Sequence, residues 1–164
     1  MRKVFHFDSP REQYVCDAAV VCCYDNRFHT GFAKFLKRMG LVMIDVIKIA
    51  GGAKALATPN RPDERYFVLD QIRKSMRLHA TKRVILMVHS DCGAYGGIGA
   101  FGGDAGLEAR RQSLELQRAM ECLRVEIPEI ASEAYFMDFE GVWQVEPAAI
   151  SMASSVGSSD VDAG

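Results

Sequence analysis

The stretch VVCCYDNRF, residues 20–28, begins as an apolar run and turns polar from Cys23 onward. A second stretch, ILMVHSDCGAYGG, residues 85–97, has the same layout, with an apolar run that ends in His89 and Cys92. Short continuous apolar runs are typical of strands that are covered on both faces. Both stretches therefore predict a buried strand with reactive side chains at its carboxyl end.

Outward from these two stretches, strand and helix patterns alternate along the chain. Strands are expected where apolar and β-branched residues run together, at residues 18–23, 42–50, 83–89 and 133–146, the last as one or two strands around Gly141. Helices are expected where apolar residues recur every three or four positions, from a cap at Asn26 to Gly40, from Asp63 to about His79, and from about Leu107 to Val125. Residues 93–106 are rich in glycine and predict a loop.

This alternation predicts an α/β fold with an open, mainly parallel sheet flanked by helices on both faces. For Cys23 to reach His89 and Cys92, the first and third strands must be neighbours, and the second strand must lie on the other side of the first. The predicted strand order is therefore 2-1-3-4. Sites in such sheets form beyond the carboxyl ends of the strands, where the strand order reverses, and both stretches end at this edge.

The composition is that of an ordinary soluble globular protein, with 49% hydrophobic and 25% charged residues. We expect one domain at residues 1–150, followed by a flexible polar tail at residues 151–164. The 20 basic and 21 acidic residues nearly balance, so the sequence indicates neither a nucleic-acid nor a membrane partner. No apolar stretch has the length of a signal peptide or a membrane span, which predicts a cytoplasmic protein whose thiols stay reduced.

The five cysteines are therefore expected to be buried, metal-bound or catalytic rather than paired in disulfides. Alternate side chains of an extended chain share a side, so Cys23 is expected to face away from Cys22. Two thiolates, from Cys23 and Cys92, and the imidazole of His89 suit Zn²⁺. Three protein ligands leave the fourth tetrahedral position open, which is typical of a catalytic zinc site.

The residues just described resemble a known family. The pattern Cys-x-Asp-x-Arg at residues 23–27, followed by His-x-x-Cys-Gly at residues 89–93, is similar to the β-class carbonic anhydrases and in particular to a small branch of them. IKIAGG at residues 47–52 and FMDFEGVWQVE at residues 136–146 extend the resemblance, which covers roughly residues 15–147. It implies a β-carbonic-anhydrase-like fold.

The resemblance also implies a lyase, a carbonic anhydrase that holds zinc on Cys23, His89 and Cys92. The implied reaction is the reversible hydration of carbon dioxide to bicarbonate and a proton by zinc-bound hydroxide. In this family an arginine, here Arg27, holds an aspartate, here Asp25. The carboxylate then accepts a hydrogen bond from the hydroxide or, in closed forms, takes the fourth zinc position. A bidentate guanidinium partner would keep that carboxylate ionised.

Family members typically carry N-terminal helices that embrace a dimer partner, whereas only a short segment precedes the first strand here. We still expect a homodimer or a higher homo-oligomer, because a site at the end of a small sheet needs walls that a partner can supply. Two other functions fit the same residues. One is a zinc hydrolase of carbonyl sulfide or carbon disulfide. The other is a catalytically silent zinc-bound interaction module in which Asp25 permanently fills the fourth position.

Other residues have a structural interpretation beside a functional one. Asp25 and Arg27 could form only a structural ion pair. His29 could shuttle protons or be a solvated surface residue, and Asp91 is expected to order the turn between the two later ligands. Packing is the expected role of Cys16, Cys22, Cys122 and His79, with Cys22 also the alternative ligand to Cys23.

The letters G-x-G-x-x-G occur at residues 97–102, after the third predicted strand. A dinucleotide-binding motif opens a helix directly in the first strand–helix turn, whereas here the candidate metal ligands intervene. We therefore interpret the loop at residues 93–106 as a flexible flap over the metal rather than as a nucleotide site.

Overall fold

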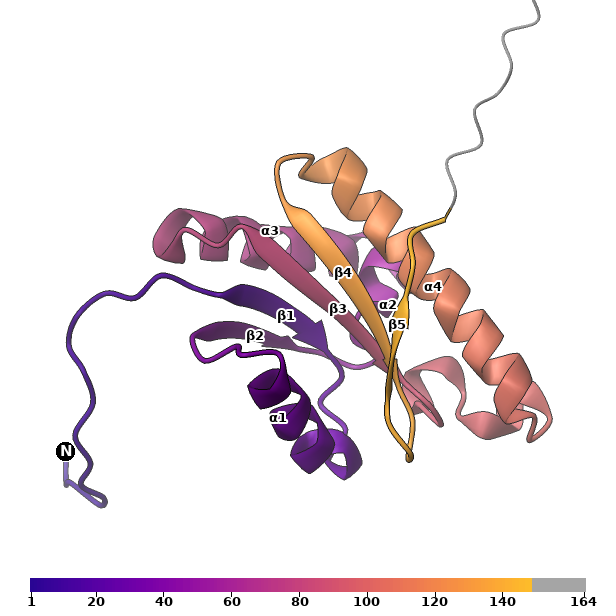
Figure 1. Ribbon diagram of the computed structural model, residues 1–164, viewed down its shortest axis with the longest axis horizontal. Helices are drawn as coiled ribbons and strands as arrows, with labels where there is room; N and C mark the ends of the chain where they lie inside the picture. Colours follow the sequence, from indigo (N-terminus) through magenta and orange to yellow (C-terminus); the bar gives the residue numbers. More distant parts are fainter. Residues whose placement is uncertain (149–164) are drawn as a thin grey trace, which may run out of the picture.

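A computed structural model describes residues 1–148 (Figure 1). Its centre is a sheet with the strand order β2-β1-β3-β4-β5, parallel throughout except for β5, which is antiparallel to β4. The strands are β1 (Ala18–Cys22), β2 (Ile44–Lys48), β3 (Arg83–His89), β4 (Ala131–Met137) and β5 (Val142–Val145). The predicted α/β class, mainly parallel sheet and 2-1-3-4 order are confirmed, and β5 adds an antiparallel edge.

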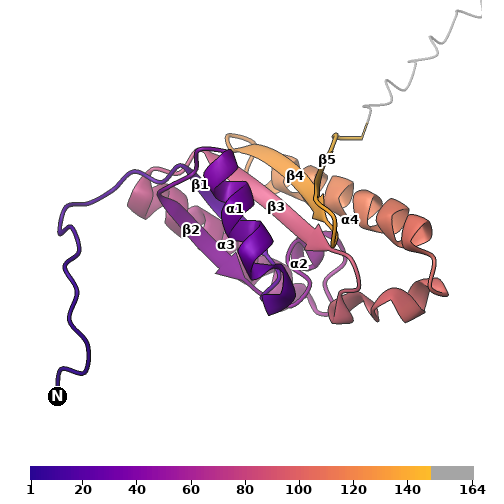
Figure 2. The same ribbon diagram turned by 60° about the horizontal axis from the view of Figure 1, so that its bottom comes forward.

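Helices cover both faces of the sheet (Figure 2). One face packs against α1 (His29–Arg38). The other face packs against α2 (Lys54–Ala57), α3 (Pro62–His79) and α4 (Ala105–Glu126). Successive residues of β1 alternate between these layers, with Val20 on the α1 side and Val21 in the larger core. Cover on both faces explains why β1 and β3 are continuous apolar runs.

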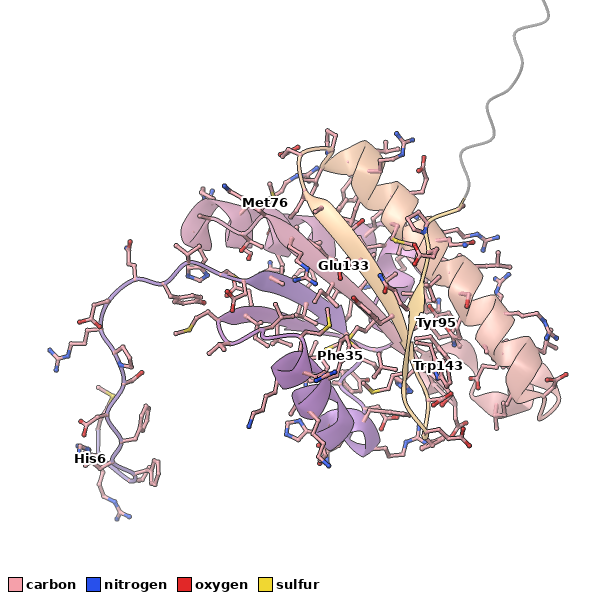
Figure 3. All side chains as sticks on the ribbon, in the orientation of Figure 1. His6, Phe35, Met76, Tyr95, Glu133 and Trp143 are labelled. Atoms are coloured by element: carbon pink, nitrogen blue, oxygen red, sulfur yellow. The ribbon has the colours of Figure 1, made fainter. Side chains whose placement is uncertain are left out.

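The layer between α1 and the sheet is rich in aromatic and thioether side chains. Phe35 projects from α1 (Figure 3). Its ring lies nearly edge-on to that of Tyr135 of β4, with 4.9 Å between the ring centroids. Leu36, Met87 and Met137 are buried in the same layer. These contacts fix α1 on the sheet and thereby also position the residues that connect β1 to α1.

The prediction that Asn26 caps the helix after β1 is wrong. Asp25 occupies the cap position, and its carboxylate accepts a hydrogen bond from the main-chain N–H of Arg27 at 3.0 Å. The chain then forms a short 3-10 helix, η1 (Asn26–Phe28), before α1 begins. Asparagine and aspartate cap helices about equally well, so their order in the sequence does not decide between two such neighbours.

The glycine-rich loop at residues 93–106 is more regular than the sequence predicted. It contains two 3-10 helices, η2 (Gly93–Tyr95) and η3 (Ile98–Phe101). Each ends at a glycine with positive φ, Gly96 or Gly102, a conformation that other residues rarely adopt. Its role as a flap stays a prediction.

Near the end of the described chain, the predicted strand pattern around Gly141 is a hairpin. The carboxylate of Asp138 accepts hydrogen bonds from the N–H groups of Glu140 and Gly141 and from the Trp143 indole, which holds the turn between β4 and β5. The tail predicted at residues 151–164 lies outside the described residues. Within residues 1–148, no helix has the length and apolar character needed to cross a membrane.

Candidate metal centre

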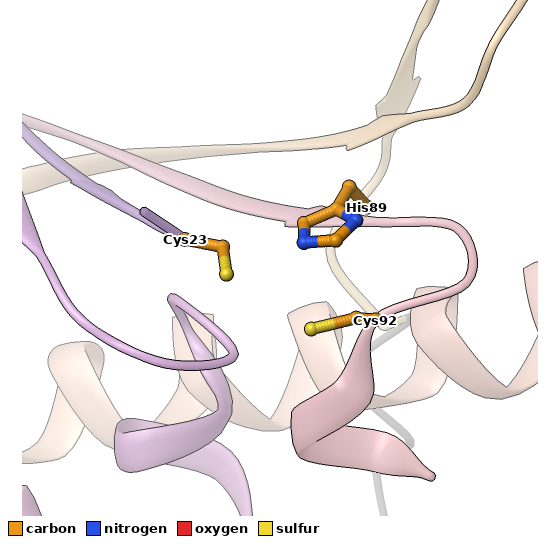
Figure 4. A group of neighbouring side chains, drawn as sticks. All are labelled: Cys23, His89 and Cys92. Carbon is orange, nitrogen blue, oxygen red and sulfur yellow. The ribbon is translucent and has the colours of Figure 1, made fainter. Parts of the chain in front are cut away.

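The topology brings the three predicted ligands together at one edge of the sheet. β1 and β3 are parallel neighbours, with Val21 of β1 opposite Leu86 of β3, so their carboxyl ends lie side by side. Cys23 directly follows β1, His89 is the last residue of β3, and Cys92 lies in the turn that follows. The ligand atoms of these three residues all lie within 4.8 Å of one another (Figure 4).

Strand alternation separates the two adjacent cysteines as the sequence predicted. Cys22 is only 4% exposed and packs in the layer beneath α1, whereas Cys23 is half-buried and faces His89 and Cys92. Burial raises the pKa of the Cys22 thiol to about 12, so this residue stays protonated at neutral pH. Within the described structure, the cluster contains Cys23 and not Cys22.

The Gly51-Gly52 turn after β2 lies directly against the backbone of the site. Gly52 has a φ of 56°, and a Cβ at this position would lie 2.3 Å from the Met87 carbonyl oxygen and 2.9 Å from the Cys23 main-chain nitrogen. Only glycine fits such a close approach in a left-handed conformation. The IKIAGG sequence thus serves to let the end of β2 support Cys23.

The neighbouring Cys92 thiol and, after it, His89 and the main chain at Asp25 and Gly51 lower the pKa of Cys23 well below its usual range. Hydrogen bonding of the Cys92 thiol to the Cys23 thiolate and then burial raise the pKa of Cys92, and the negative charge of Cys23 adds to the effect. Without a cation, the pair therefore holds one proton. A divalent cation among these atoms would favour loss of that proton, as expected for a two-thiolate metal site.

The ring of His89 is oriented for ligation through Nε2. Its Nδ1 lies 2.7 Å from the Ser90 carbonyl oxygen, which only an Nδ1–H donor satisfies, so the lone pair lies on Nε2. Nε2 is buried and has no hydrogen-bond partner among the described residues. A buried nitrogen without a partner is costly, and a metal ion at the centre of the cluster would satisfy it. The ring also packs against Phe28 in a tilted arrangement, with 4.6 Å between the ring centroids.

Asp25 and Arg27 form the predicted ion pair beside this cluster. Nη2 of Arg27 donates to Oδ2 of Asp25 at 2.6 Å, and Nε donates to both carboxylate oxygens at 3.1 Å. These bonds lower the pKa of Asp25 to about 2, so the carboxylate is ionised at neutral pH. Oδ2 lies 3.9 Å from Nε2 of His89, which places the carboxylate next to the metal position and held by the arginine.

Sequence reasoning missed a second carboxylate at Arg27. Nη1 of Arg27 donates to Oδ2 of Asp91 at 2.8 Å, and Nη2 donates to the Asp91 main-chain oxygen at 2.9 Å. Asp91 also orders the ligand turn as expected, because its Oδ1 accepts a hydrogen bond from the Ile98 N–H at 2.9 Å. The main-chain N–H of Asp91 donates to Glu108, a buried carboxylate on α4, at 2.7 Å. The only sequence signal was an acidic residue inside the motif His-x-x-Cys-Gly at residues 89–93.

A small pocket opens beside the cluster, toward α1. Its volume is about 30 Å³, enough for one or two molecules the size of water. The residues that line it are Cys22, Cys23, Asp25, Phe28, His29, Phe32, Lys48, Met87, Val88, His89 and Met137. His29 is exposed at its rim, which is compatible with either of its two predicted roles.

The other singled-out residues lie away from the cluster. Cys16 is buried and Cys122 is partly buried on α4, in keeping with packing roles. His79, at the end of α3, is partly buried, and its Nδ1 lies 2.8 Å from Oδ2 of Asp45 on β2. The hydroxyl of Tyr14 donates to the same carboxylate at 2.6 Å. This network fastens the segment before β1 to the sheet.

The geometry can now be compared with known proteins. A protein-family model described as "Putative carbonic anhydrase" matches residues 14–149, most of the chain. The chain belongs to this family. The match spans every strand of the sheet and all the residues of the cluster, together with Asp25, Arg27 and Asp91. No curated protein matches the sequence.

Solved β-carbonic anhydrases share the fold of this family member. Isoform I from the protozoan Trichomonas vaginalis superposes with a TM-score of 0.56 at 16% identity, covering 88% of this chain and 90% of that one. A carbonic anhydrase from Glaciozyma antarctica gives 0.52 at 18% identity, with 82% and 84% covered. One of two tetrameric β-carbonic anhydrases from Sordaria macrospora gives 0.54 at 12% identity, with 80% and 81% covered.

Proposed function

We propose that the protein is a zinc-dependent carbonic anhydrase that reversibly hydrates carbon dioxide to bicarbonate and a proton. The observation that carries this proposal is the convergence of Cys23, His89 and Cys92 within 4.8 Å, with the Asp25 carboxylate ionised beside them. Membership of the carbonic anhydrase family supports it independently of the geometry.

The donor set fits zinc. Two sulfurs and one imidazole nitrogen are ligands that Zn²⁺ prefers, and three protein ligands leave one tetrahedral position open. Bound there, zinc would supply a Lewis-acidic position that makes water far more acidic than it is in bulk solution. The Nδ1–H bond to the Ser90 carbonyl fixes the tautomer and the direction of the His89 ligand.

The residues around the open position have distinct tasks in this proposal. The ionised Asp25 carboxylate, near Nε2 of His89, accepts a hydrogen bond from the reacting water and orients it. Arg27 holds that carboxylate by three hydrogen bonds, so that it serves as an acceptor rather than as a fourth metal ligand. Phe28 covers one face of His89 and, with Phe32 and Met137, gives the pocket an apolar wall for an uncharged substrate.

The pocket has an apolar wall, which suits a small uncharged molecule such as carbon dioxide. Carbonyl sulfide and carbon disulfide are also small and uncharged and are the alternative substrates. For the silent module, Asp25 would have to occupy the metal's fourth position, whereas here it pairs with Arg27.

We further propose a cytoplasmic homodimer or higher homo-oligomer. Reduced Cys23 and Cys92 suit the cytoplasm. The edge strand β2 exposes Val46. Residues 1–13 extend away from the sheet (Figure 1), and Phe5 and Phe7 are exposed there. A second copy could cover these apolar groups. Sedimentation at micromolar concentration tests this, and a monomer would reject it.

The decisive experiment is stopped-flow carbon dioxide hydration on zinc-loaded protein, with the metal content measured on the same sample. We expect activity that depends on zinc, and Asp25→Ala and Arg27→Ala should each keep zinc but lose most of the activity. Carbonyl sulfide and carbon disulfide hydrolysis are assayed in parallel. Hydrolysis of either without carbon dioxide hydration would replace the proposed substrate, and full zinc content with none of the three activities would favour the silent module.

A further inference from the structure

The guanidinium of Arg27 lies between two carboxylates. One edge donates to Asp25 through Nε and Nη2, and the other donates to Oδ2 of Asp91 through Nη1 at 2.8 Å. A further bond joins Nη2 to the Asp91 main-chain oxygen at 2.9 Å. A planar guanidinium with both edges occupied has little freedom to rotate, even though the Arg27 side chain is 45% exposed.

Asp91 is itself held in an unusual position. Its φ of 52° is left-handed, which few residues other than glycine, asparagine and aspartate adopt. The main-chain N–H donates to Oε1 of Glu108, whose side chain is 1% exposed, and Oδ1 accepts from the Ile98 N–H. The carboxylate is thus bonded to the loop through one oxygen and to Arg27 through the other.

We infer that Asp91 is a positioning residue that clamps Arg27 against Asp25 and thereby keeps the Asp25 carboxylate off the metal. The inference rests on the proposed metal site. Oδ2 of Asp25 lies 3.9 Å from Nε2 of His89, so a small side-chain rotation would bring it to an ion that Nε2 ligates. Asp91 lies in the turn between His89 and Cys92. The turn that carries these two ligands therefore also determines whether the fourth metal position stays free of Asp25.

Removing the Asp91 carboxylate should release one edge of the guanidinium. Arg27 would then sample other rotamers, and Asp25 would spend more time without its partner and on the metal. A purely structural role for Asp91 in the turn makes a different prediction, because damage to the turn would weaken the site whether or not Asp25 is present.

The test uses Co²⁺ in place of zinc, because its visible absorption reports the ligand in the fourth position. Azide serves as the probe, since it must displace whatever occupies that position. Asp91→Asn keeps an oxygen for the Ile98 N–H and tolerates the left-handed backbone, but it lacks the charge that Arg27 needs. Asp91→Gly keeps the backbone and removes the side chain. Asp63→Asn is the matched control, because it breaks an exposed ion pair with Arg61, at 3.1 Å, outside the site.

We expect both Asp91 variants to bind cobalt with an altered spectrum and to bind azide about tenfold more weakly than the parent, a coupling within the range for contacting residues. Adding Asp25→Ala to either variant should restore azide binding to the level of Asp25→Ala alone, and Asp63→Asn should match the parent.

Three results would overturn the inference: unchanged azide affinity and spectrum in Asp91→Asn, a weakening that persists when Asp25 is absent, or a parent protein that binds no cobalt. If Asp91→Gly fails to fold, Asp91→Asn alone decides. A parent that shows the azide coupling but hydrates no carbon dioxide would reject the proposed function and leave the clamp intact.

Discussion

Replacing Gly52 by alanine should destabilise the protein more than a left-handed backbone alone explains. The added Cβ would lie 2.3 Å from the Met87 carbonyl oxygen, a contact that forces β3 or the β2 turn to move. Gly40 offers a matched control, because its φ is 71° and a Cβ there would meet nothing within 4 Å. Both variants carry the left-handed penalty, and only Gly52→Ala carries the clash.

The expected magnitudes follow from this comparison. A left-handed alanine costs ~1–2 kcal/mol, which is the whole effect expected for Gly40→Ala. Overpacking at a tight backbone contact adds ~1–3 kcal/mol, so Gly52→Ala should lose ~2–5 kcal/mol. A domain of this kind has a free energy of unfolding of ~5–15 kcal/mol, so a loss near the middle of the expected range leaves the variant folded.

Urea unfolding of the parent and both variants, metal-free, reduced and at the same protein concentration, measures the loss of unfolding free energy in each variant. The added atom would also lie 2.9 Å from the main-chain nitrogen of Cys23, so Gly52→Ala should bind cobalt more weakly while Gly40→Ala binds it as the parent does. Equal loss of stability in the two variants, or unchanged cobalt affinity in Gly52→Ala, would refute the argument that Gly52 supports the ligand.

Three further predictions concern the metal and the pH profile. Protein purified under reducing conditions should carry about one zinc per chain. Zinc should be lost in each of the variants Cys23→Ser, His89→Ala and Cys92→Ser and kept in Cys22→Ser. Full zinc content in Cys23→Ser would disprove the ligand assignment. Chelation should lower the melting temperature, because the ion binds only the folded state, and calorimetry with and without chelator would show no shift if the site were empty. Hydration should be weak at neutral pH and rise through pH 6.5–9.5, because two thiolates neutralise the ion and make its water a weaker acid than at a three-histidine site. Asp25, whose pKa is about 2, stays ionised throughout that range and cannot cause the rise, so a flat profile would contradict the charge argument.

The sheet and the clustering of Cys23, His89 and Cys92 were predictable because they follow from short-range rules. Continuous apolar runs marked β1 and β3, strand alternation separated Cys22 from Cys23, and the need for Cys23 to reach His89 required β1 and β3 to be neighbours. Each step used residues within a few positions of one another, or a single topological condition.

The contacts that hold the candidate ligands in place could not be predicted from the sequence, and the reason is again physical. The bond between Arg27 and Asp91 joins residues 64 positions apart and depends on a left-handed backbone at Asp91. Glu108 was unremarkable in sequence as a charged residue in the first turn of a helix, yet it is buried beneath the ligand turn because that helix packs against it. Such contacts depend on how elements pack, which local pattern does not encode.

Whether a protein needs its metal ion in order to fold depends on which segments supply the ligands. Zinc fingers fold only with their ion, because their ligands come from segments that the ion alone holds together. Here Cys23 and His89 follow two strands paired in a buried parallel ladder, and Gly52 presses the β2 turn against Cys23. The fold therefore sets the separation of the ligands before any ion binds, and the unpartnered Nε2 of His89 is the remaining cost of that arrangement. A bound ion would satisfy this nitrogen without reordering the chain, because the paired strands already position the candidate ligands.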